Sequence, residues 1–380
     1  MRRVFDTCCG CMKCMEICPV NAIKEVTDDE GFSVPMIDDE LCVKCGQCEK
    51  RCQFNNITPV EPELTSKFAA QYDDNQVRKN STSGGVFSAL SDYFFSLNGA
   101  IFGVRLNTDF TASYFKATDR QSWRAMRGSK YIQADSSELF RAIKEEFVNR
   151  PVLVVATPCV IAAIREYFQN KISTNILLVD IVCHGVTSPK VFRDTIRFIE
   201  NKSHENVVSY QFRSKEKGWH TYIESASTSS GRVLMNERYM RVFRGLYGSQ
   251  CISRKCCSVC PYANMKRQGD ITIGDCWGID RVSPDFDDDR GTSLVLINTN
   301  KGKEIFEKIK FRLNIIPLNK DDCIQPQLIA PSRVSRNRSK FWAEYSSKGF
   351  EFVAKKYSRY GVINDLKHII YPLYRKMLKK

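Results

Sequence analysis

CCGCMKCMEICP at residues 8–19 and CVKCGQCEKRC at residues 42–52 repeat one cysteine spacing, C-x2-C-x2-C-x3-C. Thiolates at this spacing hold 4Fe-4S clusters, because the first three wrap one cubane while the fourth reaches across to the other cluster. We therefore expect two clusters that cross-link the fold. Their predicted ligands are Cys8, Cys11, Cys14 and Cys52 for one cluster, and Cys42, Cys45, Cys48 and Cys18 for the other.

Zinc and disulfide bonds are the alternatives for these cysteines. Zinc sites use two separated pairs of ligands, which does not explain four cysteines at this spacing in two copies. Disulfides belong mainly to exported proteins, and the first three residues lead directly into a polar segment rather than into a signal peptide. The chain has 17 cysteines and no export signal, which favours metal binding in a reducing compartment. We therefore expect a cytoplasmic protein.

The composition leaves room for a second, larger domain. The chain has 380 residues, of which 43% are hydrophobic and 26% charged, as in an ordinary soluble protein. No apolar run reaches the roughly 18 residues of a membrane span, so no transmembrane segment is predicted. The formal charge of +14 suits an acidic redox partner, an anionic cofactor, nucleic acid or a phospholipid surface. Charge alone does not choose among them.

The larger domain is predicted to follow a proline-containing linker at residues 57–66 and to open with a strand at 67–72. Ser-Thr-Ser-Gly-Gly at residues 81–85 then precedes apolar residues at helical spacing as far as Leu97, which is the order of a capped helix. A glycine-rich helix start presents free N–H groups, the usual backbone site for a phosphate. An ordinary capped helix is the alternative.

A predicted hairpin of strands at residues 100–106 and 111–117 comes next. The sequence RGSKY at residues 127–131 then combines cations, hydroxyls and a glycine. This set suits a nucleotide phosphate or a flavin edge, and it suits a solvated loop equally well.

Residues 151–185 read as a βαβ unit, with a strand at 152–156, a helix at 160–168 and a strand at 176–182. The two strands should be parallel, so their carboxyl ends meet at one edge of the sheet, where open α/β sheets place their ligands. Cys159 follows the first strand and Cys183 the second. We therefore expect these two cysteines to be close neighbours.

The rest of the chain is predicted to alternate strands and helices before a basic tail. We expect a helix at 189–200, strands at 207–213, 220–228, 233–236, 269–274 and 292–298, and a helix at 301–310. From residue 333 the pattern is helical and basic. This tail either packs on the core, which we favour, or makes peripheral contact with a membrane face.

Several short motifs follow one another in the larger domain. They are SGG at 83–85, GSKY at 128–131, TPC at 157–159, CHG at 183–185, GW at 218–219, a C-x2-C pair at 257–260, GDITIGD at 269–275, WG at 277–278 and SLVLINT at 293–299. In this order they resemble the family of beta subunits of coenzyme F420 hydrogenases and dehydrogenases. The resemblance covers residues 67–302, with a ferredoxin domain ahead of them as in many members.

This resemblance implies a non-covalent FAD that trades a hydride with a two-electron partner and single electrons with iron-sulfur clusters. On it, we place the FAD at two sets of residues, namely Ser83, Gly84 and Gly85 for the phosphates, and Ser129, Lys130 and Tyr131 for the polar edges. The catalytic candidates are His184, Trp219 and Lys130. Ordinary packing at a domain core or turn is the alternative for His184 and Trp219.

A third 4Fe-4S cluster is also suggested, with the ligands Cys159, Cys183, Cys257 and Cys260. The alternative is that Cys159 and Cys183 are small buried residues. The chain departs from the family pattern at Gln53, which replaces a proline outside the ligand shell, and at Val160, where a glutamine often stands. Extra cysteines allow other ligand choices, namely Cys9, Cys251, Cys256 and Cys276.

The predicted fold is of the mixed α/β class, with a small ferredoxin-like domain before a larger domain with a partly parallel sheet and flanking helices. Its parts are a two-cluster ferredoxin domain (1–56), a linker (57–66), a flavin-binding domain (67–332) and a basic helical tail (333–380). We expect an oxidoreductase that passes electrons between 4Fe-4S clusters and FAD, with hydride exchange to coenzyme F420 or another soluble carrier.

Two other functions are weighed against this one. The first is an electron-transfer subunit without its own substrate site, associated with surface-polysaccharide biosynthesis. The second is a cluster-bearing nucleic-acid protein, which the tandem cysteine motif disfavours, so no nucleic-acid partner is expected. The expected partner is a redox protein or a soluble hydride carrier. The residues do not determine the oligomeric state.

Overall fold

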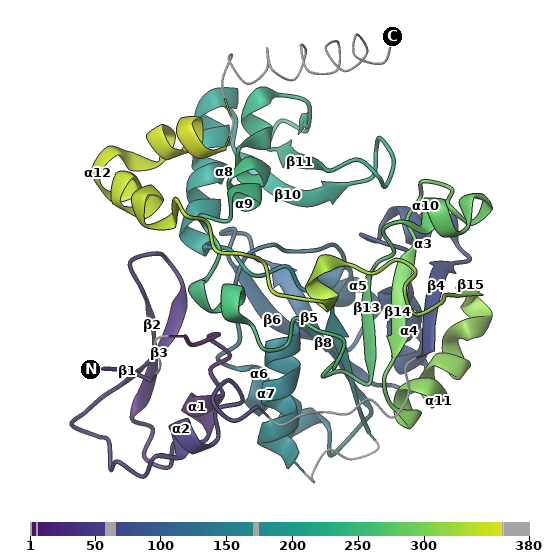
Figure 1. Cartoon of the computed structure of the whole chain (residues 1–380), viewed down its shortest axis with the longest axis horizontal. Helices are drawn as coiled ribbons and strands as arrows, with labels where there is room; N and C mark the ends of the chain where they lie inside the picture. Colours follow the sequence, from purple (N-terminus) through teal and green to yellow (C-terminus); the bar gives the residue numbers. More distant parts are fainter. Residues whose placement is uncertain (1, 5–6, 58–65, 170–174, 359, 361–380) are drawn as a thin grey trace.

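The structure is a computed structural model that describes residues 2–4, 7–57, 66–169, 175–358 and 360. Most of the predicted linker at 57–66 and the end of the predicted tail, residues 361–380, lie outside the described residues. Figure 1 shows three parts: an amino-terminal module, a large sheet with its helices, and a smaller lobe that contains α8, α9 and α12.

The amino-terminal module contains a small antiparallel sheet with the strand order β1 (Arg2–Arg3), β3 (Ser33–Ile37) and β2 (Ile23–Thr27). Two one-turn helices, α1 (Lys13–Glu16) and α2 (Gln47–Lys50), carry cysteines from the two motifs. Each helix follows a residue with positive φ, and at Gly46 the absence of a side chain makes this turn easy. The module packs through α1 against α6 and α7 of the larger domain.

Nine strands form the large sheet in the order β15-β4-β14-β13-β9-β8-β5-β6-β7. Their bounds are β15 (Leu313–Pro317), β4 (Ser66–Tyr72), β14 (Ser293–Ile297), β13 (Ile271–Asp275), β9 (Ile176–Ile181), β8 (Val152–Ala156), β5 (Ala100–Leu106), β6 (Ala112–Ala117) and β7 (Ala134–Asp135). The central strands β13, β9, β8 and β5 are parallel, whereas β14, β4, β15 and β6 pair antiparallel with neighbours. The predicted mixed, partly parallel sheet is therefore confirmed.

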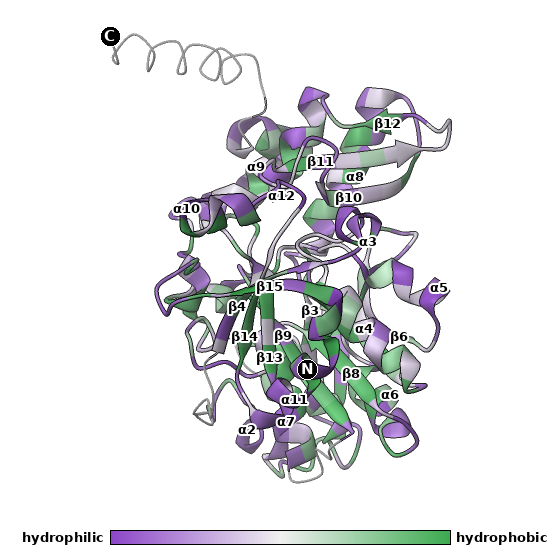
Figure 2. Ribbon diagram, turned by 90° about the vertical axis from the view of Figure 1, so that its right-hand side faces the viewer, coloured by the Kyte–Doolittle hydropathy of each residue, from purple (hydrophilic) through white to green (hydrophobic). Residues whose placement is uncertain are grey.

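Helices cover both faces of this sheet, because its central strands are apolar on both sides (Figure 2). On one face, α4 (Val86–Ser96) and α11 (Asn300–Ile309) pack with Leu153 of β8. On the other face, α6 (Leu139–Glu146) and α7 (Pro158–Phe168) pack with Val152 and Val154. Neighbouring residues of β8 thus point to opposite faces, which explains why the strand reads as a continuous apolar run. The shorter helices are α3 (Asn75–Lys79), α5 (Arg120–Trp123) and α10 (Ile279–Val282).

The predicted βαβ unit is present as β8, α7 and β9, with β8 parallel to β9. The predicted hairpin is present as β5 and β6. One strand starts later than predicted: β11 covers Ile223–Thr228 instead of beginning at His220. The reason is local, because the Thr221 hydroxyl donates to the Gly218 carbonyl at 2.7 Å and the His220 imidazole lies 2.6 Å from an Asp287 oxygen, which keeps these residues in a turn.

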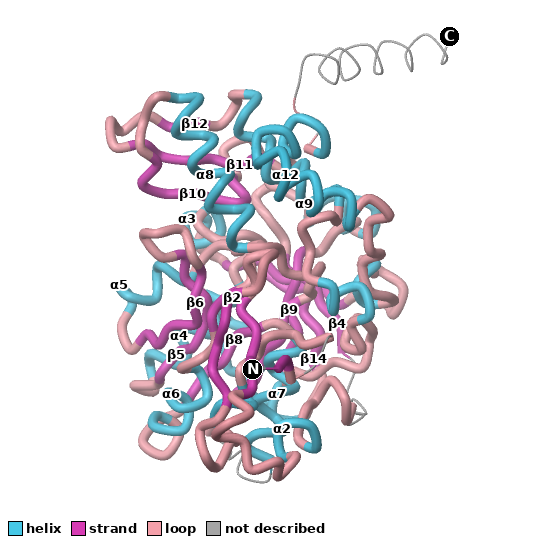
Figure 3. Tube along the Cα trace, turned by 90° about the vertical axis from the view of Figure 1, so that its left-hand side faces the viewer, coloured by secondary structure: helices cyan, strands magenta, loops and turns pink. Residues whose placement is uncertain are grey.

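The smaller lobe packs the three-stranded sheet β10 (Val207–Ser214), β11 and β12 (Val233–Leu234) against three helices (Figure 3). These helices are α8 (Pro189–Ser203), α9 (Val242–Ser249) and α12 (Arg338–Tyr357). Phe341, Trp342 and Val353 of α12 belong to the same apolar core as α8 and α9. The packing that we favoured for the tail therefore holds as far as Tyr357. Within the described residues, no helix is both long enough and apolar enough to span a membrane.

Candidate functional site

The first cysteine site is a small pocket in the amino-terminal module. Its lining includes five cysteines of the two motifs, namely Cys8, Cys11, Cys14, Cys48 and Cys52. Burial raises the pKa of Cys8 to about 11, against the effect of the nearby Arg254 charge, and burial also raises the pKa of Cys14, to which the charges of Cys11 and Cys8 add. Buried thiolates that repel one another are stabilised by bound cations, so this donor set fits an iron-sulfur cluster.

Three predicted ligands of the second cluster, Cys18, Cys42 and Cys48, pack against one small apolar core. The fourth, Cys45, is exposed, and the amide of Ala22 donates to the Cys18 sulfur at 3.2 Å. Across the described ranges, no three Cys, His, Asp or Glu side chains converge on a single metal-ion position. A cubane is a different case, because its four irons take one thiolate each at separate corners.

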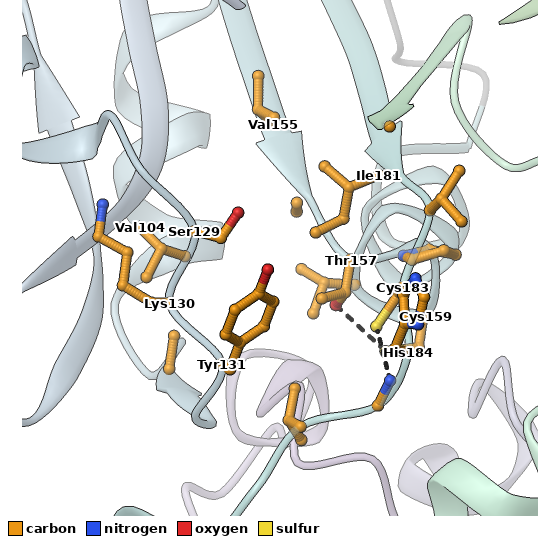
Figure 4. A pocket seen from close by; sticks show the side chains of 18 of the residues that line it. Val104, Ser129, Lys130, Tyr131, Val155, Thr157, Cys159, Ile181, Cys183 and His184 are labelled. Carbon is orange, nitrogen blue, oxygen red and sulfur yellow. Dashed lines mark hydrogen bonds between the residues drawn. The ribbon is translucent and has the colours of Figure 1, made fainter. Parts of the chain in front are cut away.

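A larger cavity, with a volume of about 320 Å³, lies at the carboxyl edge of the parallel strands. The loops after β8 and β9 line it, together with the end of β13, the segment before α4 and residues 127–133. Figure 4 shows these segments around one space, with the hydroxyls of Ser129 and Tyr131 pointing into it. The cavity is where the topology of an open α/β sheet places a ligand.

The four cysteines of the predicted third cluster all line this cavity, although they come from three separate loops. Cys159 and Cys183 are close neighbours, as their positions after adjacent parallel strands predicted (Figure 4). The pKa of Cys183 is raised by burial and then by the charges of Cys257, Cys159 and Cys260. Burial raises the pKa of Cys260 to about 12, whereas a hydrogen bond from Cys256 lowers the pKa of Cys257 to about 7. These four thiols thus form a second buried set with the chemistry of cluster ligands.

The predicted phosphate residues divide into two groups. Ser83 and Gly85 line the cavity, and Gly85, with a φ of +92°, precedes α4, whose first turn has no side-chain cap. Gly84 does not line the cavity. A Cβ atom at Gly84 would lie 2.1 Å from the carbonyl oxygen of Ala70 and 2.5 Å from the amide nitrogen of Ser293. Gly84 is therefore needed for the close approach of this turn to β4 and β14.

The predicted flavin-edge residues lie on the facing loop. The amide of Ser129 donates to the Thr82 hydroxyl at 2.9 Å, which ties this loop to the start of α4. Tyr131 packs between Phe212 and Tyr247 while its hydroxyl points into the cavity.

Lys130 has its amino group turned away from the cavity (Figure 4). Its Nζ donates to the carbonyls of Ala125, Met126 and Arg127 at 3.0, 2.9 and 2.9 Å. Burial lowers the pKa of Lys130 to about 7, whereas three carbonyl acceptors favour the charged form. In this arrangement the side chain caps the preceding turn rather than facing a ligand.

His184 and Trp219 also have different surroundings. His184 lines the cavity, and burial lowers its pKa. Trp219 is 0% exposed and does not line the cavity, so the alternative of ordinary packing describes it better. Its ring stacks on Trp277 at a centroid distance of 4.5 Å, and its Nε1 donates to Asp275 at 3.2 Å.

Sequence reasoning missed two residues at this site. Asp275 lines the cavity, and the nearly buried Arg213 donates to its carboxylate at 3.1 Å. The position of Asp275 at the carboxyl end of a predicted strand could have singled it out, because ligands bind at that edge. Nothing in the local sequence marks Arg213, which reaches the cavity from β10 in the smaller lobe.

Comparisons with known proteins match two parts of the chain. Residues 7–56 match a family described as a 4Fe-4S dicluster domain, and residues 149–320 match a family described as the C terminus of the beta subunit of coenzyme F420 hydrogenase/dehydrogenase. Ferredoxin-1 of Caulobacter vibrioides is 38% identical over 68 residues, which cover 17% of this chain and 56% of that protein.

Longer matches extend over most of the chain. The F-type subunit of the F(420)H(2) dehydrogenase of Methanosarcina mazei is 23% identical over 330 residues, covering 82% of this chain and 84% of that protein. A chain in a solved structure of the F420-reducing [NiFe] hydrogenase complex from Methanosarcina barkeri is 18% identical, with a TM-score of 0.49, and the match covers 80% of this chain and 96% of that one. Through residues 149–320, behind a 4Fe-4S dicluster domain, the chain belongs to the family of beta subunits of coenzyme F420 hydrogenases and dehydrogenases.

Proposed function

We propose that this chain is an iron-sulfur flavoprotein oxidoreductase that holds FAD in the large cavity and acts on coenzyme F420 or another soluble two-electron carrier. The observation that carries the proposal is the meeting of three features at one cavity: four cysteines, the uncapped start of α4 and the loop 127–133. FAD would supply the exchange between one-electron and two-electron chemistry that iron-sulfur clusters alone do not provide.

The cavity fits a flavin in the character of its lining. Its walls include apolar side chains such as Val104, Val155 and Ile181, which suit a flat ring, and only a few polar groups converge on it. The amide groups at the start of α4 suit a phosphate, because no side chain caps them. His184 would face the ring or the substrate as a neutral imidazole, since burial lowers its pKa. Lys130 and Trp219 are better placed to support these groups than to touch them.

Anaerobic purification with iron, sulfide and flavin counted per chain tests this function. We expect about one FAD, and about twelve irons if all three cysteine sets hold cubanes or about eight if only the amino-terminal sets do. Protein that contains the clusters but no flavin under gentle conditions would contradict the proposal. It would favour the alternative, an electron-transfer subunit without its own substrate site. The Methanosarcina mazei relative is named as one subunit of a dehydrogenase, which supports a role beside partner proteins in either case.

The glycine before α4 allows a sharper test of the flavin site. We expect Gly85→Ala to reduce the flavin retained per chain, because a side chain at a φ of +92° strains the turn and its Cβ would lie 2.9 Å from the Cβ of Tyr72. Gly231→Ala is the matched control. It has a φ of +87° in the turn between β11 and β12, and its Cβ would meet no atom within 4 Å. Equal flavin content in the two variants would argue against this placement of the cofactor.

A further inference from the structure

Gln53 directly follows the second cysteine motif, and it is buried where the amino-terminal module meets the large cavity. The side chain is 4% exposed. Its Nε2 atom donates toward the Cys11 sulfur at 3.3 Å, the Cys9 sulfur at 3.6 Å and the carbonyl oxygen of Cys159 at 3.3 Å. One amide group therefore contacts a predicted ligand of the first cluster and the main chain of a predicted ligand of the third.

The orientation of this amide is set by its surroundings. All three neighbours of Nε2 are hydrogen-bond acceptors, so exchanging the nitrogen and the oxygen would aim Oε1 at acceptors only. The observed orientation leaves Oε1 buried with no hydrogen-bond donor among the described residues. A buried carbonyl without a partner costs free energy, so the site retains this cost in order to present the N–H groups. Tyr262 fixes the main chain here, because its hydroxyl donates to the Gln53 carbonyl at 2.7 Å.

Cys9 completes the contact between the two cysteine sets. Its thiol forms side-chain hydrogen bonds with both Cys11 and Cys159. Cys9 and Gln53 thus form a continuous hydrogen-bonded bridge from the first cluster site to the third.

The two cysteine motifs differ at this position. Pro19 follows the last cysteine of the first motif and has no side-chain donor, whereas Gln53 follows the last cysteine of the second. Hydrogen bonds to a ligand sulfur stabilise the reduced cluster, because reduction adds negative charge to the iron-sulfur core and its thiolates. An amide aimed at Cys11 therefore favours reduction of one cluster over that of its pseudo-equivalent neighbour.

We propose that Gln53 is a positioning residue that raises the reduction potential of the cluster held by Cys8, Cys11, Cys14 and Cys52, at the point where that cluster faces the third cysteine set. This inference rests on the proposed function in that it requires bound clusters, but it does not require FAD. It gives the amino-terminal module two electronically different centres instead of two equal ones.

A redox titration of the whole protein, followed by electron paramagnetic resonance, tests the inference. Gln53→Met keeps the length and burial of the side chain but removes both N–H groups. We expect it to shift the midpoint potential of one amino-terminal cluster to a lower value and to leave the other in place. Gln47→Met, at an exposed glutamine of α2 in the same module, is the control and should shift neither. A Gln53→Met protein with its full iron content and unchanged midpoint potentials would overturn the inference.

A measurement on the unmodified protein covers the case in which Gln53→Met loses its cluster. With glutamine labelled by nitrogen-15 only in the side-chain amide, pulsed electron paramagnetic resonance of the reduced protein should detect a coupling between that nitrogen and a cluster. Absence of this coupling would also overturn the inference. Protein with clusters and the coupling but no flavin would refute the proposed function while leaving the role of Gln53 intact.

Discussion

Replacing Cys159 and Cys257 together by alanine is expected to remove about four irons per chain while the amino-terminal clusters remain, since each cubane contains four. The two cysteines come from different loops of the cavity, and both belong to the buried set with Cys183 and Cys260. Two thiolates are too few to hold a cubane that uses four. Iron and sulfide analysis of anaerobically purified protein, together with Mössbauer spectroscopy, would measure the loss.

The matched control for this pair is the double variant of Cys251 and Cys276 to alanine. Both of these cysteines are buried, and neither lines the cavity, so we expect the iron content to stay at the wild-type value. An iron content that does not fall in the Cys159 and Cys257 variant would show that the third cluster is wrong. Cys159 and Cys183 would then be small buried residues, the alternative that the sequence left open.

The second large effect concerns stability in the smaller lobe. Glu224 on β11 is 6% exposed, and burial raises its pKa to about 8, against the effect of the nearby Arg244 charge. The folded state therefore keeps a proton on Glu224 that the unfolded state releases above about pH 4.5, so the contribution of Glu224 to stability falls as the pH rises from about 4.5 to about 8. Glu224→Gln removes this dependence, and we expect it to raise the free energy of unfolding by about 3 kcal/mol near pH 7.5.

Thermal unfolding under anaerobic conditions at about pH 5 and about pH 8 would measure this effect, because the stabilisation by Glu224→Gln should grow with pH. Glu205 in the same lobe is the control. Hydrogen bonding to Ser230 lowers its pKa, so Glu205→Gln should reduce stability above the pH at which the carboxyl ionises. A stabilisation by Glu224→Gln that is equal at both pH values would contradict a buried, protonated carboxyl.

Much of the fold and part of the site could be predicted because local patterns carry the information. Two and three residues between cysteines fix how far each thiol reaches, so spacing alone indicated the ligands in the amino-terminal module. A helix between two apolar strands requires a crossover, which makes the strands parallel and brings Cys159 beside Cys183. The strand and helix ends were less accurate, as at β11, because side-chain contacts with distant loops decided where pairing begins.

The tertiary structure alone decided which candidates face the cavity. Trp219 was predicted to line it, but the side chain packs on Trp277 and acts through Asp275. Lys130 was predicted to contact the cofactor, but its amino group caps a turn. Motifs place a residue in a loop, and the direction of its side chain depends on contacts that the loop itself does not encode.

The sequence by itself determined the two sets of cluster ligands in the amino-terminal module, the order of strands and helices, and the edge of the sheet where the site lies. The structure decided how the module is joined to that edge. Gln53 contacts Cys159 although 106 residues separate them, and Arg213 reaches Asp275 across 62. Such pairs have no local period or spacing, because they form only when separately folded surfaces pack together.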